Sequence, residues 1–269
     1  MSTRRMLSAS SCTHVDANGM ITDSWDKFIS NCKKYRAQEY YEVGNYIPLD
    51  MGEHGILNME IMAFFPPFFI YDEPLYPRCP NVFLYSKELT KIKLSVPSGR
   101  HDICPYFMIN AETSLFPLIP SEVRNNIPVV LSPFYDAGQI SSSDAIREYG
   151  REPLYSVGAG ENYLKGRLLL MSKAFTLNIK EQFEYHKVCA YGEGTSLLRL
   201  HGFIKKDFTS SDRIKYLADG SGPYNYATAD VFQDSRSLHT SFYYYDSTGN
   251  IQYRKDSFPD IYLPLGFCL

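Results

Sequence analysis

The stretch SFYYYDSTGNIQYR, residues 241–254, predicts a β-hairpin. A tyrosine-rich run, 241–245, and a second run, 251–254, flank a five-residue turn that contains Gly249. Turns of this length that contain glycine commonly join neighbouring antiparallel strands. The hairpin therefore indicates a fold built from antiparallel β pairs in this part of the chain.

Short apolar runs separated by proline and glycine continue this pattern through the chain after Tyr46. The candidate strands are 56–65, 67–71, 81–86, 89–96, 103–109, 127–132, 185–191 and 197–204. The segment 167–179 fits a strand or a helix, and 143–149 fits a short helix. The pattern predicts a mainly β chain, and we expect an antiparallel β-sandwich of the jelly-roll type with one or more short helices.

An amphipathic helix is predicted near the N-terminus, over 23–38, with Thr22 or Asp23 as its cap. Its apolar face is formed by five residues at helical spacing: Trp25, Phe28, Ile29, Cys32 and Tyr35. Two interpretations are open, because such a face can lie on its own domain or pack on a neighbouring subunit. We accordingly divide the chain into an N-terminal arm and helix, 1–40, and a β-sandwich domain, 41–269.

The composition argues against several classes of partner. The 269 residues include 27 basic and 30 acidic side chains, a net charge of −3, whereas a nucleic-acid-binding surface needs a basic surplus or stripe. No run approaches the roughly 18 apolar residues of a membrane helix. Six widely spaced cysteines without a Cys-X-X-Cys pair favour free thiols in a reducing compartment over a zinc site.

Catalytic motifs are weak. The glycine-rich segment 157–162 lacks the third glycine of a dinucleotide loop and fits a turn. His101 and Cys104 would point to opposite faces of a strand, which is poor geometry for an activated thiol. The six histidines are scattered without metal-ligand spacing. We therefore expect no catalytic residue, no metal site and no enzymatic activity.

Tyrosine is the strongest signal, with 22 Tyr and 17 Phe beside a single Trp. A phenol combines a large apolar ring with one hydroxyl group, which suits protein–protein contacts. It also ionises near pH ~10. We therefore interpret the clustered tyrosines as contacts between subunits that alkali would release: Tyr40, Tyr41, Tyr224, Tyr226, Tyr243, Tyr244 and Tyr245.

One motif resembles a known family. Asp230, Val231, Phe232 and Gln233 follow the pair Tyr224–Asn225. This arrangement is similar to a stretch near the C-terminus of the occlusion-body polyhedrins of cypoviruses. The helix at 23–38 followed by a Tyr/Asn-rich segment at 40–46 resembles their N-terminal region, and the chain would be a divergent member.

The resemblance implies a trimer of β-sandwiches whose helices reach to neighbours in a crystal lattice. The crystals would form in the host cell cytoplasm, embed virus particles and dissolve in an alkaline insect gut. No cofactor would be required. Some relatives hold a nucleotide in the lattice, and no positions for one carry over to this chain.

Three other classes stay open. A viral capsid-type β-sandwich shares the composition but needs no sensitivity to alkali. A crystal-forming or pore-forming toxin should carry an amphipathic segment able to insert into a membrane. An enzyme with an unrecognised site should have a deep pocket lined by carboxylates or histidines with perturbed pKa values.

Overall fold

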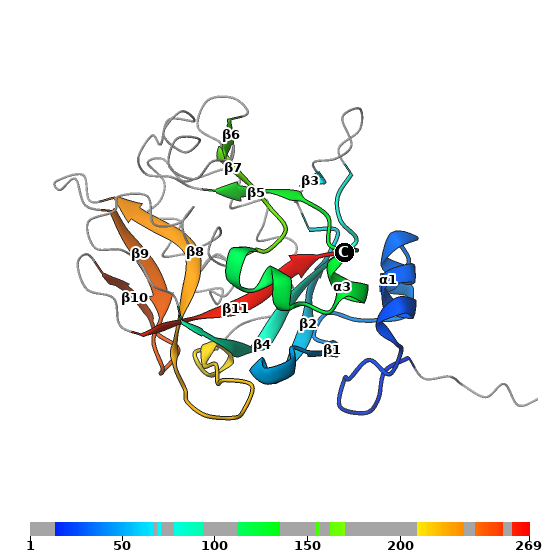
Figure 1. The fold of residues 1–269 in the computed structure, drawn as a ribbon, viewed down its shortest axis with the longest axis horizontal. Coiled ribbons are helices and arrows are strands. Elements are labelled where there is room, and N and C mark those ends of the chain that lie inside the picture. The colour runs from blue at the N-terminus through cyan, green and yellow to red at the C-terminus, as the bar shows by residue number, and fades with distance from the viewer. Residues whose placement is uncertain are drawn as a thin grey trace, which may run out of the picture.

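The computed structural model describes residues 14–66, 69–70, 78–93, 112–134, 154–156, 162–169, 209–233, 240–254 and 260–269. These residues form a mainly β structure with a seven-stranded mixed sheet and a four-stranded sheet (Figure 1). The larger sheet has the order β1 (Tyr46–Asp50), β2 (Ile56–Phe64), β4 (Val82–Lys93), β11 (Ile261–Cys268), β8 (Asn225–Gln233), β9 (Thr240–Tyr245) and β10 (Ile251–Arg254). The smaller has the order β3 (Phe69–Ile70), β5 (Val130–Phe134), β7 (Asn162–Gly166) and β6 (Leu154–Ser156).

The described helices are few and short. The longest is α1 (Trp25–Lys33), and α3 (Ser121–Arg124) contacts it. Four single 3₁₀ turns accompany them: η1 (Ala37–Glu39), η2 (Gly52–His54), η3 (Phe116–Leu118) and η5 (Ser211–Arg213).

Strand β11 forms the middle of the larger sheet, and Figure 1 shows it in red between β4 and β8. All eight of its residues are buried, and Leu269 beyond it is buried as well. This fits the sequence IYLPLGFC, because a strand covered on both faces reads as a continuous apolar run. An apolar end such as residues 264–269 would be unfavourable in water, so the sequence predicts that it docks on the domain, and the structure confirms this.

The pairing of β11 corrects the expectation of a purely antiparallel fold. It pairs antiparallel with β4 but parallel with β8, so the sheet is mixed. Pro264 has no N–H to donate, and the register with β4 shifts on both sides of it. Two buried hydroxyl groups of β4 compensate there: Thr90 Oγ1 donates to the Leu263 carbonyl at 2.8 Å, and Ser86 Oγ accepts from the Leu265 N–H at 2.9 Å.

Gly266 lies where residues 168–169 cross β11. The Leu169 N–H donates to the Gly266 carbonyl at 2.8 Å. A Cβ atom at position 266 would lie 2.4 Å from the Leu169 carbonyl oxygen and 2.7 Å from a ring carbon of Tyr85. The bare backbone of glycine therefore permits the crossing.

The predicted hairpin is confirmed as β9 and β10, which pair antiparallel from Ile251↔Tyr245 to Arg254↔Phe242. Asp246 Oδ1 accepts the Thr248 N–H at 2.9 Å and the Asn250 N–H at 3.0 Å, which closes the turn. Gly249 adopts φ +78°, and a Cβ there would lie 2.1 Å from the Ser210 carbonyl oxygen.

Other predicted strands need correction. The runs 81–86 and 89–96 belong to one strand, β4, as far as Lys93, and residues 94–96 lie outside the described residues. Strand β1 is not among the predicted strands; it contains Pro48, which an edge strand tolerates. The segments 103–109, 143–149, 185–191 and 197–204 lie outside the described residues, and 167–179 is described only to Leu169.

Helix α1 is shorter than predicted. Ser24 is its cap, in place of Thr22 or Asp23, and its hydroxyl accepts the Lys27 N–H at 3.4 Å. The helix ends at Lys33, because Tyr35 adopts a left-handed backbone conformation with φ +56°.

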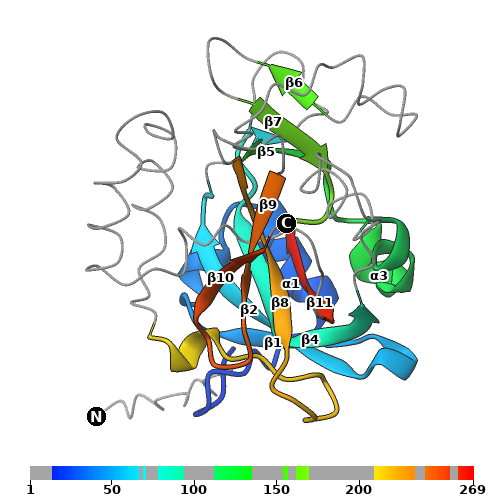
Figure 2. The ribbon, with the colours of Figure 1, turned by 90° about the vertical axis from the view of Figure 1, so that its left-hand side faces the viewer.

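The apolar face of α1 packs on its own chain (Figure 2). Phe28, Ile29 and Cys32 are buried in the same core as the sheet. Trp25 packs against this core, and its Nε1 donates to the Pro48 carbonyl at 2.9 Å. The described structure therefore agrees with the first interpretation of the helix, in which α1 covers its own domain.

We predict that Phe28→Ala lowers the free energy of unfolding by about 3–5 kcal/mol, because it removes a fully buried ring from this core. Urea unfolding followed by circular dichroism at pH 7 measures the loss. The exposed neighbour Lys34 provides the control, since Lys34→Ala should change stability by no more than about 0.5 kcal/mol. A loss below about 1 kcal/mol for Phe28→Ala would contradict the packing of α1 on the sheet.

Candidate functional site

The tyrosines singled out in the sequence fall into different environments. Tyr41, Tyr226, Tyr244 and Tyr245 are buried, whereas Tyr40 and Tyr224 are partly exposed. Tyr243 is described by its backbone alone, which pairs with Tyr253 in the hairpin. For the four buried rings, contacts within their own chain account for the burial, so they are not surface groups that a neighbouring subunit could touch.

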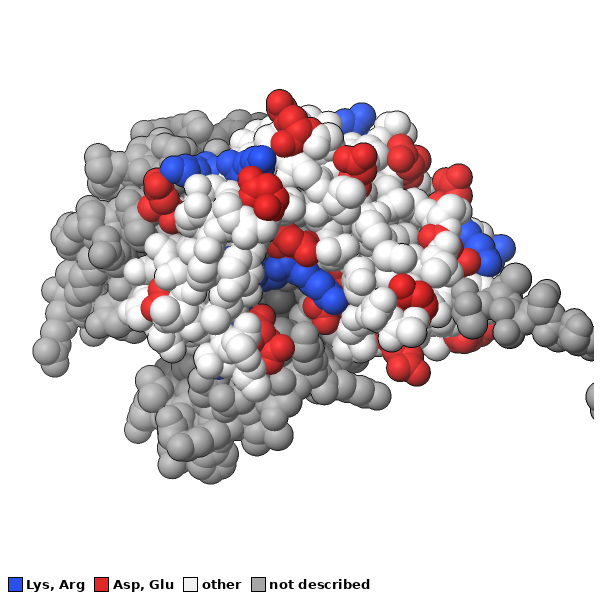
Figure 3. All heavy atoms as spheres, turned by 90° about the horizontal axis from the view of Figure 1, so that it is seen from below, with Lys and Arg blue, Asp and Glu red and all other residues white. Residues whose placement is uncertain are grey.

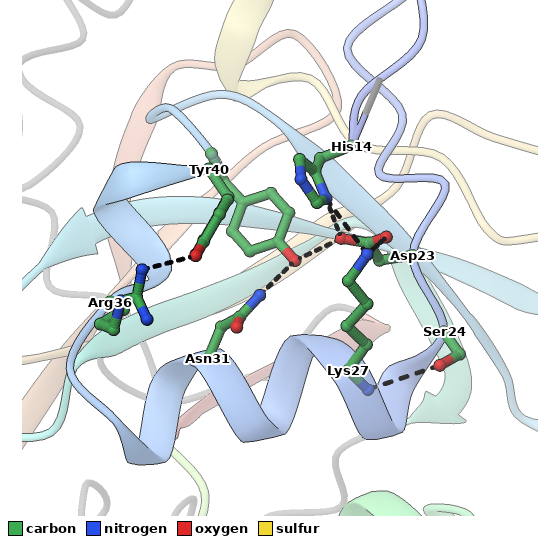
Figure 4. Close-up of polar contacts among 8 residues, drawn as sticks. His14, Asp23, Ser24, Lys27, Asn31, Arg36 and Tyr40 are labelled. Carbon is green, nitrogen blue, oxygen red and sulfur yellow. Dashed lines mark hydrogen bonds and ion pairs between the residues drawn. The ribbon is translucent and has the colours of Figure 1, made fainter. Parts of the chain in front are cut away.

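The first tyrosine site, here called the Asp23 network, joins the segment before α1 to Tyr41 (Figure 4). Asp23 Oδ2 accepts a hydrogen bond from the Tyr41 hydroxyl at 2.8 Å and lies 2.7 Å from His14 Nδ1. Its other oxygen, Oδ1, pairs with Lys27 Nζ at 2.8 Å. Asn31 Nδ2 completes the network by donating to the Tyr41 hydroxyl at 3.1 Å.

The network shifts the pKa values of both central groups. Burial acts to raise the pKa of Asp23, but the hydrogen bonds from Lys27, Tyr41 and His14 outweigh it, and the pKa is lowered. The pKa of Tyr41 is raised, first by burial and then by its bond to the Asp23 carboxylate. The Asp23 carboxylate therefore stays charged to a lower pH than an ordinary aspartate, while the Tyr41 phenol stays neutral well into alkali.

Tyr40 stands at the rim of this network. Its hydroxyl accepts from Arg36 Nη2 at 2.7 Å, and the same guanidinium group is paired with Glu39 at 2.7 Å. The His14 ring meets the Tyr40 ring at 4.9 Å between centroids, edge to face. Tyr40 thus packs against the His14 ring, and the Tyr40 side chain stays partly exposed to solvent.

The second site, here called the Tyr226 cluster, lies between β4, β8, β9 and β11. The Tyr226 and Tyr245 rings are 5.1 Å apart and the Tyr224 and Tyr262 rings are 4.8 Å apart, measured between centroids. Consecutive residues of a strand point to opposite faces. Tyr244 therefore joins the main core, while Tyr245 joins this second, smaller core.

Two buried cations sit among these rings. Lys215 Nζ lies 5.0 Å from the Tyr85 ring centroid and 5.8 Å from that of Tyr226, and it donates to the backbone carbonyls of Ser86 and Lys87. The Arg213 guanidinium carbon lies 5.8 Å from the Tyr245 ring centroid. The sequence analysis missed both residues, because their spacing in the loop before β8 carries no periodic signal that would predict burial.

Ionisation of Tyr226 is strongly disfavoured. Burial raises the pKa of its phenol well above the usual value, and interactions with Tyr245 and Tyr85 raise it further, whereas Arg213 lowers it. Burial likewise raises the pKa of the Cys32 thiol to about 12 and that of Cys268 well above its usual value. At neutral pH these phenols and thiols are therefore uncharged parts of the core.

The four residues that carry the family resemblance, Asp230 to Gln233, lie in β8. Val231 pairs with Phe242 and Gln233 with Thr240 of β9, after a register shift that follows Ala227. The motif thus belongs to the same pair of strands as the Tyr226 cluster. The Asp23 network is on the other side of β11, near β1 and β2.

The described residues also bear on two other kinds of site. Among them, no three His, Cys, Asp or Glu side chains gather as a metal ion would require. In the same part of the chain, none of the helices combines the length and apolar character needed to cross a bilayer. On the face seen in Figure 3, acidic side chains predominate, and a few basic side chains lie among them.

Comparison of the chain with protein-family models, with curated proteins and with solved structures finds no match.

We predict that Asp23→Asn lowers the free energy of unfolding by about 1–3 kcal/mol at pH 7, because the variant loses the charge that holds Lys27 and His14. The folded-state pKa of Asp23 lies below its ordinary value, so its stabilisation is present above that value and is lost as pH falls. Urea unfolding at a series of pH values should show the two proteins converging below about pH 4. Asp26→Asn, an exposed site on α1, should show no such pH-dependent difference.

We predict that Tyr226→Phe makes stability less dependent on pH in alkali. The folded-state pKa is raised, so above about pH 10 the unfolded chain ionises first, and each such phenol costs about 1.4 kcal/mol of stability per pH unit. The slope of unfolding free energy against pH between about 10 and 12 should fall by this amount in the variant. Tyr216→Phe, where the ring is 45% exposed, should keep the wild-type slope. Equal slopes in all three proteins would contradict the assignment.

Proposed function

We propose that this chain is a structural protein that assembles with copies of itself into crystals in the cytoplasm of an infected cell. The crystals embed virus particles, remain intact near neutral pH and dissolve in alkali. The observation that carries the proposal is the burial of tyrosine phenols in two separate sites of one domain. The resemblance of residues 230–233 to the cypovirus polyhedrins supports the viral setting.

The alkaline step follows from the physical chemistry of these phenols. At neutral pH they are uncharged, and the net charge of −3 does not oppose close packing of many copies. In strong alkali each phenol that ionises places a charge in an apolar core. Because the affected rings lie inside the protomer, alkali weakens each subunit, and loss of the subunit fold dissolves the lattice.

This mechanism differs from the expectation formed on the sequence. The sequence predicts that the tyrosines form contacts between subunits, and ionisation of those contacts would separate intact subunits. With Tyr41, Tyr226, Tyr244 and Tyr245 inside the domain, the proposal makes unfolding the cause of release. Dissolution should then coincide with the loss of native circular dichroism.

The proposal includes the arrangement of the two sheets and the number of copies in the assembly. The two sheets would be the layers of a jelly-roll-like sandwich, and three copies would form the trimer that the resemblance implies. A bridge between Leu168, just after β7, and Phe267 of β11 supports close contact between the layers. A nucleotide bound in the lattice is compatible with this arrangement and is not needed for it.

Expression in insect cells tests the proposal. Intracellular crystals should be visible by light microscopy and should diffract, and suspension in carbonate buffers of rising pH should dissolve them only above about pH 10. Crystals of Tyr226→Phe should need a higher pH than those of Tyr216→Phe. A protein that stays monomeric at high concentration, or assemblies that dissolve independently of pH, would overturn the proposal. Closed shells of fixed size would favour the capsid-type alternative.

A further inference from the structure

Two exposed apolar side chains mark opposite ends of strand β2. Within the described part of the chain, the large hydrophobic residues with substantial exposure are Ile56 at 54%, Phe65 at 38% and Tyr216 at 45%. Ile56 begins β2, and Phe65 directly follows its end. A strand advances about 3.3 Å per residue, so the two side chains lie roughly 30 Å apart. The domain therefore carries one exposed apolar group at each end of this strand.

The Phe65 end is an aromatic pair. Tyr35, which follows α1, stacks on Phe65 with 6.3 Å between ring centroids and 6° between the ring planes. Both residues have left-handed backbones, with φ +56° and +51°, and they are the non-glycine residues with this conformation in the described ranges. Such a conformation is unfavourable for a bulky side chain, and residues that keep it commonly serve a function.

A buried residue, Asn81, holds both turns in place. Its Oδ1 accepts the Ala37 N–H at 3.2 Å, and its backbone carbonyl accepts the Phe65 N–H at 2.8 Å. Its Nδ2 donates to Gln38 Oε1 at 3.1 Å, and Gln38 Nε2 in turn donates to the Tyr35 carbonyl at 2.8 Å. The aromatic pair is thus fixed before any partner arrives, which lowers the entropy lost on binding.

The two ends of β2 carry opposite charge. Around Tyr35, residues 33–39 include three basic side chains and one acidic one. Lys34 is exposed, and Arg36 is paired with Glu39. Around Ile56, residues 50–56 include two acidic side chains and no Lys or Arg.

Glu53 is the most accessible of the charges near Ile56. Its side chain is 89% exposed, and its nearest partner is His54 Nε2 at 3.7 Å. Across Gly55, the loop that contains Ala218 adds Asp219, which is already neutralised by Lys91 at 3.1 Å. Turn η2 lies at the lower edge of the molecule in Figure 1, and Figure 3 shows this lower face with acidic side chains predominating.

We propose that the Tyr35–Phe65 pair of one copy binds the Ile56 corner of the next copy, with Lys34 placed against Glu53. This inference rests on the proposed self-assembly and names one of its contacts. Because the two patches differ and lie at opposite ends of β2, the contact is head-to-tail, and it repeats either into a closed ring or into an open row. Its apolar area is small, so it acts together with other contacts in the lattice, as contacts below about 800 Å² do.

A charge exchange in the full-length chain tests the contact. Alkali-dissolved protein is refolded at neutral pH until its native circular dichroism returns, and the association of the refolded protein is then followed by light scattering and sedimentation. Lys34→Glu and Glu53→Lys should each slow association about tenfold, because each places like charges together. The double variant, Lys34→Glu with Glu53→Lys, should restore the wild-type behaviour. A double variant as defective as the single ones would overturn the pairing of these two residues.

A second variant distinguishes a role of the aromatic pair in association from a role in the stability of the subunit. Tyr35→Gly relieves the left-handed backbone strain, so the urea midpoint of the isolated subunit should not fall, while association should weaken. A large loss of subunit stability in Tyr35→Gly would assign the aromatic pair to the fold and overturn this proposal.

The two proposals fail differently. If the wild-type chain associates and every variant matches it, this contact is wrong and the proposed self-assembly stands. If the wild-type chain never associates under any of these conditions, both proposals are wrong.

Discussion

The insertion of β11 into the middle of the larger sheet is the constraint on which the rest of the structure depends. In the described sheet, the strands on its two sides, β4 and β8, each pair with β11 and do not pair with each other. Its side chains also form part of the core against which α1 packs, as the contact between Trp25 and Phe267 shows, with 6.5 Å between ring centroids. Removing this strand would therefore separate the sheet into two halves and expose the core between them.

Proline within a central strand is normally unfavourable, and here the neighbouring strand compensates for it. Ser86 and Thr90 are fully buried polar residues of β4 that hydrogen-bond the β11 backbone on either side of Pro264. Without them, a carbonyl and an N–H group would be left unsatisfied in the core, which is costly. The side-chain hydroxyls thus allow β11 to lie in the buried middle of the sheet, although Pro264 interrupts its backbone hydrogen bonds to β4.

The tyrosines show how one residue type serves two roles. In the Asp23 network the Tyr41 hydroxyl bonds a carboxylate, whereas in the Tyr226 cluster the rings pack against one another and against buried cations. Both environments disfavour the phenolate, the first through burial and the adjacent negative charge, the second mainly through burial. The proposed alkaline release then becomes a property of the folded subunit, and the proposed contact between copies involves other residues, Tyr35 and Phe65.

Features that depend on local pattern could be predicted from the amino-acid sequence: the hairpin of β9 and β10, strand β2, an N-terminal amphipathic helix and a buried C-terminal segment. The sequence pattern overestimated the helix, because the turn at Tyr35 is held by Asn81, a residue more than forty positions away. Three features became evident from the three-dimensional structure: β11 lies in the centre of the larger sheet, Arg213 and Lys215 are buried among tyrosine rings, and Tyr41 faces inward. Each of these depends on contacts between segments far apart in the chain, and side-chain periodicity within a segment carries no information about which partner will cover it.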